Sequence, residues 1–62
     1  MDESRITAAV QACIKDALKS AKPFRSINDS LVKLKVHGWS EEERLEVQTR
    51  VLQEMKRRRE SG

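Results

Sequence analysis

Apolar residues recur every three or four positions along the first third of the chain. They are Ile6, Val10, Cys13, Ile14, Ala17, Leu18 and Ala21. This spacing places them on one face of a helix. Asp2 or Ser4 can cap the first turn of that helix, and Pro23 disfavours helical geometry at the residue before it. The pattern therefore predicts a helix over residues 4–21 and a short linker over residues 22–25.

The next apolar residues form a main row and a flanking row on a second helix. The main row is Ile27, Leu31 and Leu34, and the flanking row is Val32 and Val36. The alternation over residues 31–36 is also typical of a short strand, but a lone strand has no partner here. Ser26 resembles an N-cap and Gly38 a left-handed terminator. We therefore expect a second helix over residues 27–37.

Ser40 and Glu43 form the sequence signature of a capping box, and three consecutive glutamates follow the serine. The apolar residues Leu45, Val47, Val51, Leu52 and Met55 continue from that start. They predict a third helix over residues 41–59, with frayed ends at about 1–3 and 60–62. Because the connections are short, neighbouring helices should pack together. The expected fold is all-α: a small three-helix bundle that forms a single helical domain over residues 1–62.

Composition limits what so short a chain can do. In its 62 residues, apolar and charged residues each make up 37%, and a domain of this size buries only about 60% of its unfolded surface. One cysteine cannot form an internal disulfide, and Cys13 with His37 falls short of the four ligands of a structural zinc site. Cys13 also lies on the apolar face of the first helix, with no base beside it. We therefore expect no enzyme, cofactor, metal or small-molecule substrate.

The N-terminal segment lacks the basic start and long apolar run of a secretion signal, and apolar runs elsewhere are too short to span a membrane. The first helix has an apolar face rich in alanine and lacks the large aromatic side chains of an interfacial anchor. A single cysteine is compatible with a reducing compartment. The sequence thus predicts no membrane association and an intracellular protein, cytoplasmic or nuclear.

The net charge of +3 is distributed in blocks of alternating sign. Residues 15–37 carry six basic and two acidic side chains, whereas residues 38–55 carry two basic and five acidic ones. The last block contains a basic cluster, Lys56, Arg57, Arg58 and Arg59. Such a cluster either complements the helix dipole or contacts phosphate. In a helix-turn-helix protein, however, the glutamates at 41–43 would face the DNA and repel it. A nucleic-acid-associated regulatory protein using the basic end is the alternative hypothesis.

The leading hypothesis is a non-catalytic protein–protein interaction or dimerisation module with a regulatory or adaptor role. Trp39 lies in the hinge beside Gly38, where it either packs across the helix junction or anchors a partner. The apolar arc of the third helix is broad enough for an internal core and a second helix from outside. The residues expected to bind a partner, which includes a second copy of the chain, are Trp39, Val47, Val51 and Met55.

The segment from Ile27 to Met55 resembles in part the BESS dimerisation motif of insect chromatin proteins. The resemblance consists of a short leucine-bearing helix, a turn, and a helix reading Arg-Leu-Glu-Val-Gln-Thr-Arg-Val over residues 44–51. That motif's Phe-Leu-x-Ser-Leu opening is out of register here, and a first helix precedes the segment. The resemblance implies dimerisation in a nuclear protein.

Overall fold

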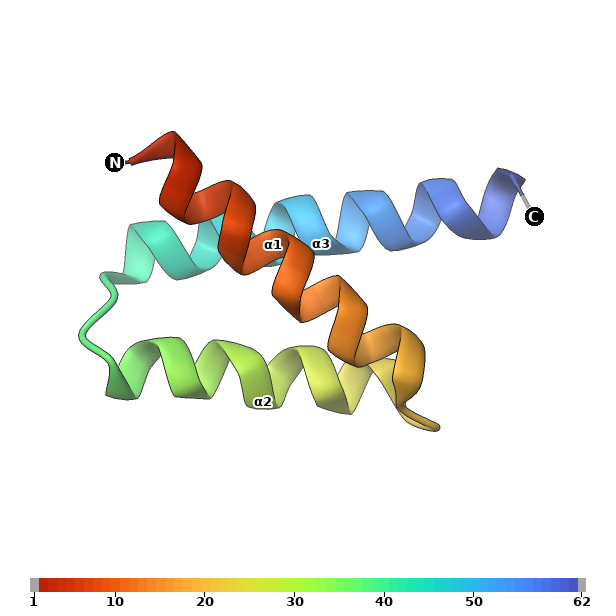
Figure 1. The fold of residues 1–62 in the computed structure, drawn as a ribbon, viewed down its shortest axis with the longest axis horizontal. Coiled ribbons are helices and arrows are strands. Elements are labelled where there is room, and N and C mark those ends of the chain that lie inside the picture. The colour runs from red at the N-terminus through yellow and green to blue at the C-terminus, as the bar shows by residue number, and fades with distance from the viewer. Residues whose placement is uncertain (1, 62) are drawn as a thin grey trace.

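The computed structural model describes residues 2–61, which form three helices and no strand. They are α1 (Glu3–Lys19), α2 (Pro23–Val36) and α3 (Glu41–Ser61). Figure 1 shows α2 and α3 running in opposite directions, with α1 crossing them diagonally. Each helix contacts the other two. The predicted all-α three-helix bundle is confirmed.

The N-cap of α1 is Asp2, one of the two candidates that the sequence offered. Its Oδ1 accepts hydrogen bonds from the backbone N–H groups of Ser4 and Arg5, at 3.0 and 3.3 Å. These bonds satisfy amides that have no partner within the helix. The helix ends at Lys19 and the chain leaves through Ser20 in an extended conformation. It is therefore two residues shorter at this end than expected.

The predicted start of α2 at residue 27 is wrong, because the helix begins at Pro23. Proline is favoured in the first helical turn, since its fixed φ suits the helix and the N–H that it lacks would have no partner there. The segment expected to be a linker, residues 22–25, is mostly helical. Ser26 is not an N-cap: its N–H already donates to the carbonyl of Lys22, at 3.0 Å.

Gly38 ends α2 as expected, with a φ of 88°. The N–H of Gly38 donates to the carbonyl of Lys35 and that of Trp39 to the carbonyl of Leu34, at 3.1 and 3.0 Å. This pair of bonds is a Schellman motif, which needs a left-handed residue at its centre. Trp39 and Leu34 are both partly buried against the core, so the end of α2 is joined to the interior of the bundle.

The capping box at the start of α3 is confirmed. The Ser40 Oγ accepts from the Glu43 N–H at 3.2 Å, and the Glu43 Oε1 accepts from the Ser40 N–H at 3.1 Å. The helix then continues through Glu60 and Ser61, two residues beyond the expected end. Of the ends expected to fray, at about 1–3 and 60–62, Glu3, Glu60 and Ser61 are helical, and Met1 and Gly62 lie outside the described residues.

The core is small and every helix contributes to it. Its buried members are Ile6, Cys13, Ile14, Ala17, Ile27, Val47 and Val51. Half-buried Val10, Leu31, Leu34, Trp39 and Met55 surround them. The predicted inner faces of α1 and α2 are thus largely correct, and Leu18 and Ala21 are the exceptions because both are exposed.

Candidate interaction surfaces

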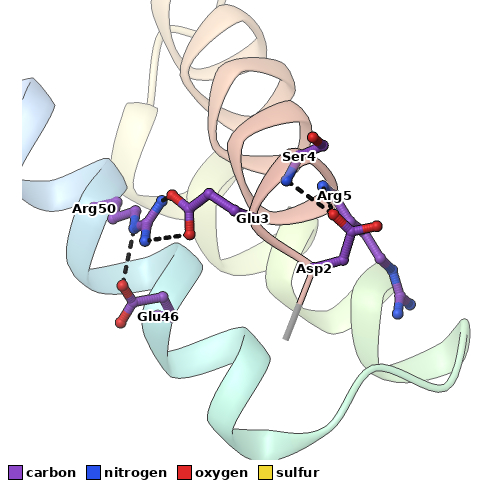
Figure 2. A network of polar contacts seen from close by, with 6 residues as sticks. All are labelled: Asp2, Glu3, Ser4, Arg5, Glu46 and Arg50. Atoms are coloured by element: carbon purple, nitrogen blue, oxygen red, sulfur yellow. Dashed lines mark hydrogen bonds and ion pairs between the residues drawn. The ribbon is translucent and has the colours of Figure 1, made fainter.

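An ion-pair network joins the start of α1 to the middle of α3 (Figure 2). Arg50 donates to the carboxylate of Glu3 through both terminal nitrogens and to Glu46 through Nε, the last bond being 2.9 Å long. Hydrogen bonding from Arg50 lowers the pKa of Glu3, and the two carboxylates raise the pKa of Arg50. The network links α1 to α3, and its three charged side chains are paired with one another within the chain.

Trp39 is held in place by a second group of α1 and α3 residues. The guanidinium of Arg5 lies 4.0 Å from the centroid of the indole ring, a cation–π contact. Arg5 also pairs with Glu43 at 3.3 Å, so the capping box, the N-terminal turn of α1 and the hinge are linked. Trp39 is half-buried against the core. Its contacts match the packing role that the sequence left open beside the partner-anchor role.

The assignment of Val47 and Val51 to a partner surface needs correction. Both side chains are 0% exposed and belong to the internal core, so neither can contact a partner while the bundle is folded. Met55 is half-buried and packs against the same core. The row of α3 that the sequence analysis directed outward therefore faces inward, because α1 and α2 cover it.

The outward row of α3 is instead formed by Leu45 and Leu52, which are 53% and 38% exposed. Exposed Glu41, Gln48 and Lys56 share their side of the helix. We call these five residues the α3 outer stripe. The seven-residue spacing of Leu45 and Leu52 is the sequence signal for this stripe, and it runs beside the row of Val47 and Val51.

α2 carries an exposed apolar row of its own. Phe24, Val32 and Val36 are 65%, 52% and 79% exposed and lie on one side of the helix at multiples of four residues. Two of the three adjoin lysines, since Lys33 and Lys35 flank Val32 and Val36. Val32 and Val36 are the flanking row that the sequence predicts for this helix.

All four residues of the basic cluster, Lys56 to Arg59, are exposed. Arg57 and Arg58 share one carboxylate, that of Glu54, at 3.0 and 3.4 Å. The junction of α1 and α2, which carries Lys19, Lys22 and Arg25, lies at the same end of the molecule as the C-terminal end of α3 (Figure 1). The glutamates at 41–43 lie at the opposite end. Two basic segments that are distant in sequence thus lie at the same end of the bundle, on different helices.

Grooves border α1 on the sides of both other helices. The groove between α1 and α3 has a volume of about 570 Å³ and is lined by Thr7, Val10, Gln11, Ile14, Arg50, Gln53, Glu54, Arg57 and Arg58. A smaller one, about 220 Å³, lies between α1 and α2 beside Cys13 and His37. Burial raises the pKa of the Cys13 thiol, which favours the protonated and less nucleophilic form. Within residues 2–61, no three His, Cys, Asp or Glu side chains group as metal ligands would.

No helix in the described part of the chain has both the length and the apolar character that a membrane crossing requires. Comparison with known proteins finds no matching family model, no matching curated protein and no matching solved structure. The partial resemblance of residues 27–55 to the BESS motif has no counterpart in these comparisons.

Proposed function

We propose that this chain is a non-catalytic protein–protein association module and that the α3 outer stripe is its contact surface. The observation that carries the proposal is the exposure of Leu45 and Leu52 on the side of α3 opposite fully buried Val47 and Val51. One helix therefore presents apolar side chains in two directions. The inner direction builds the bundle, and the outer direction is available to another protein.

The size of the core supports this assignment. Among the described residues, seven are buried, whereas six large apolar side chains are at least 38% exposed. Exposed apolar residues that lie singly are ordinary, but a row of them along a helix is typical of a contact surface. Removing Leu45 and Leu52 from water would add apolar burial that this small bundle cannot provide alone. Trp39 lies outside this row, and its ring packs against the core and the guanidinium of Arg5.

Quantitative affinity capture from the source cells tests the proposal when wild type is compared with a Leu45→Gln/Leu52→Gln double variant. Both side chains are replaced by polar ones of similar length at exposed positions, so the helical content measured by circular dichroism should stay unchanged. We expect at least one protein, counting untagged copies of this chain, to be enriched on wild type and lost from the variant. Equal capture by both, with no self-association of wild type, would contradict the proposal.

A second candidate function is binding to the phosphate backbone of a nucleic acid at the basic end. The observation that favours it is the placement of Lys19, Lys22 and Arg25 at the same end of the bundle as the basic cluster, away from the glutamates at 41–43 (Figure 1). The repulsion expected at the start of α3 would then not oppose binding. Arg57 and Arg58 share Glu54, which leaves the net charge of that group positive.

Fluorescence anisotropy with a labelled 20-base-pair DNA and a single-stranded RNA of the same length would test this candidate. Affinity should fall steeply as salt rises, because each neutralised phosphate releases a counterion. An Arg58→Ala/Arg59→Ala variant should bind more weakly, whereas Lys33→Ala/Lys35→Ala at the other end should bind as wild type does. The absence of binding by wild type at low salt would exclude this function.

A further inference from the structure

We propose that a second copy of this chain is the partner of the α3 outer stripe, with the two α3 helices packed antiparallel about a two-fold axis. This inference rests on the proposed function and names the partner that it leaves open. In this arrangement Leu45 contacts Leu52 of the partner subunit, and Leu52 contacts the partner subunit's Leu45. An interface of this kind is self-complementary, as a two-fold dimer requires.

The distribution of charge along α3 carries the inference, together with Glu41 and Lys56 on the outer stripe, which make no ion pair among the described residues. The first eight residues of α3, Glu41–Gln48, contain four glutamates and one arginine, a net charge of −3. The remaining residues, 49–61, contain five basic and two acidic side chains, a net charge of +3. Antiparallel packing places the negative half of each helix beside the positive half of its partner, whereas parallel packing places like charges together. Antiparallel packing is therefore the arrangement in which the charges are complementary.

The positions of the exposed leucines fix the register. If Leu45 lies opposite Leu52 of the partner subunit, the two-fold axis passes between Gln48 and Thr49. The same register places Glu41 opposite the partner subunit's Lys56. Both of these charged residues are exposed, and neither takes part in an ion pair among the described residues. A single alignment thus pairs leucine with leucine and glutamate with lysine along the α3 outer stripe.

The charge polarity of α3 also suits its own helix dipole, which favours acids at the N-terminal end and bases at the C-terminal end. The dipole does not account for two exposed leucines in the middle of the helix. The exposed row of α2 offers no comparable fit, because Arg25, Lys33 and Lys35 surround it against Asp29 alone. Antiparallel packing of α2 on a second copy would place like charges together. The inference is therefore specific to α3.

Charge reversal with mixing tests both the partner and the register. Glu41→Lys and Lys56→Glu should each weaken self-association roughly tenfold in dissociation constant at low salt, since each loses two ion pairs and gains two repulsive ones. An equimolar mixture of the two variants should recover near-wild-type association, because both pairs are then opposite in charge. Asp29→Lys and Arg25→Glu on α2 are matched controls that should associate as wild type. Sedimentation velocity measures all of these.

Cysteine cross-linking gives a second readout of the same geometry. In a Cys13→Ala background, Gln48→Cys lies beside the proposed axis and should form an intermolecular disulfide under mild oxidation. Gln53→Cys lies in the groove between α1 and α3, so its disulfide should form much more slowly at the same concentration. Non-reducing electrophoresis compares the two rates.

The outcomes separate the two proposals. Two results together would overturn the antiparallel register. One is a mixture of Glu41→Lys and Lys56→Glu that associates no better than either variant alone, and the other is equal cross-linking at the two cysteine positions. A wild-type chain that stays monomeric would overturn the second copy as partner. The proposed function survives that result only if the Leu45→Gln/Leu52→Gln variant loses a captured protein, because the contact surface would then serve a different partner.

Discussion

At the scale of single residues, a few polar and conformational positions decide where each helix begins and ends. Asp2, Gly38 and the pair of Ser40 with Glu43 were recognisable from sequence because each acts on backbone groups only a few residues away. Pro23 was misjudged for a related reason. Proline disfavours helical geometry at the residue before it but is favoured in a first turn, and the linker predicted over residues 22–25 follows from the first property alone.

Gly38 is constrained by its backbone conformation and not by space. Its φ is 88°, and a Cβ added there would meet no atom within 4 Å. We expect Gly38→Ala to lower the free energy of unfolding by about 1 kcal/mol, because an L-residue is strained in this region. Gly38→Asn should cost less, since asparagine tolerates the left-handed conformation. Urea denaturation measures both, and an alanine variant as stable as wild type would contradict the backbone argument.

Glu43 makes the bundle sensitive to acid. Hydrogen bonding to the Ser40 backbone, aided by the charge of Arg5, lowers the pKa of Glu43 from its ordinary value of 4.5. The folded state therefore holds this proton less tightly than the unfolded state does. The stabilisation is complete above pH 4.5 and is lost as the pH falls through the lower pKa of the folded state.

Thermal unfolding between pH 7 and pH 3 checks this assignment. Wild type should be more stable than Glu43→Gln near neutral pH, and the difference between the two should shrink as the solution is acidified. Glu3, whose pKa is lowered by Arg50, leaves the variant with some acid sensitivity. Two curves that stay parallel over the whole range would show that Glu43 does not contribute through its charge.

At the scale of helices, amphipathic periodicity correctly predicts the inner faces of α1 and α2. For α3, the row predicted to bind a partner is the row that faces the core. Val47 and Val51 form one apolar row of α3, and Leu45 and Leu52 form another on the opposite side. Periodicity reveals both rows, but it does not tell which one the rest of the bundle covers. That choice depends on how α1 and α2 pack, which is a property of tertiary structure.

The two rows of α3 should respond differently to truncation. Val51→Ala removes fully buried methyl groups and should lower the free energy of unfolding by about 2 kcal/mol. Leu52→Ala removes a larger side chain from an exposed position and should cost less than about 1 kcal/mol when the chain is dilute. Urea denaturation at micromolar concentration compares them. A larger loss for Leu52→Ala than for Val51→Ala would reverse the assignment of the inner and outer rows.

At the scale of the whole molecule, the fold produces surfaces that no single segment possesses. The grouping of Lys19, Lys22 and Arg25 with the basic cluster at one end of the bundle depends on the reversal of direction between α1 and α2 (Figure 1). The sequence shows that residues 15–37 and the basic cluster each carry a net positive charge. It does not show that the two lie at one end of the molecule, because their separation in space depends on helix packing. The all-α three-helix architecture, in contrast, followed from local patterns and was predicted correctly.

The central claim is that the α3 outer stripe joins two copies of this chain, and sedimentation equilibrium of wild type at rising concentration tests it most directly. The average mass should rise from 7.2 kDa toward twice that value and no further, since a two-fold interface closes on itself. Under the same conditions the Leu45→Gln/Leu52→Gln variant should stay at the monomer mass. A wild-type chain that remains at 7.2 kDa at every concentration, or a variant that dimerises as well as wild type, would contradict the claim.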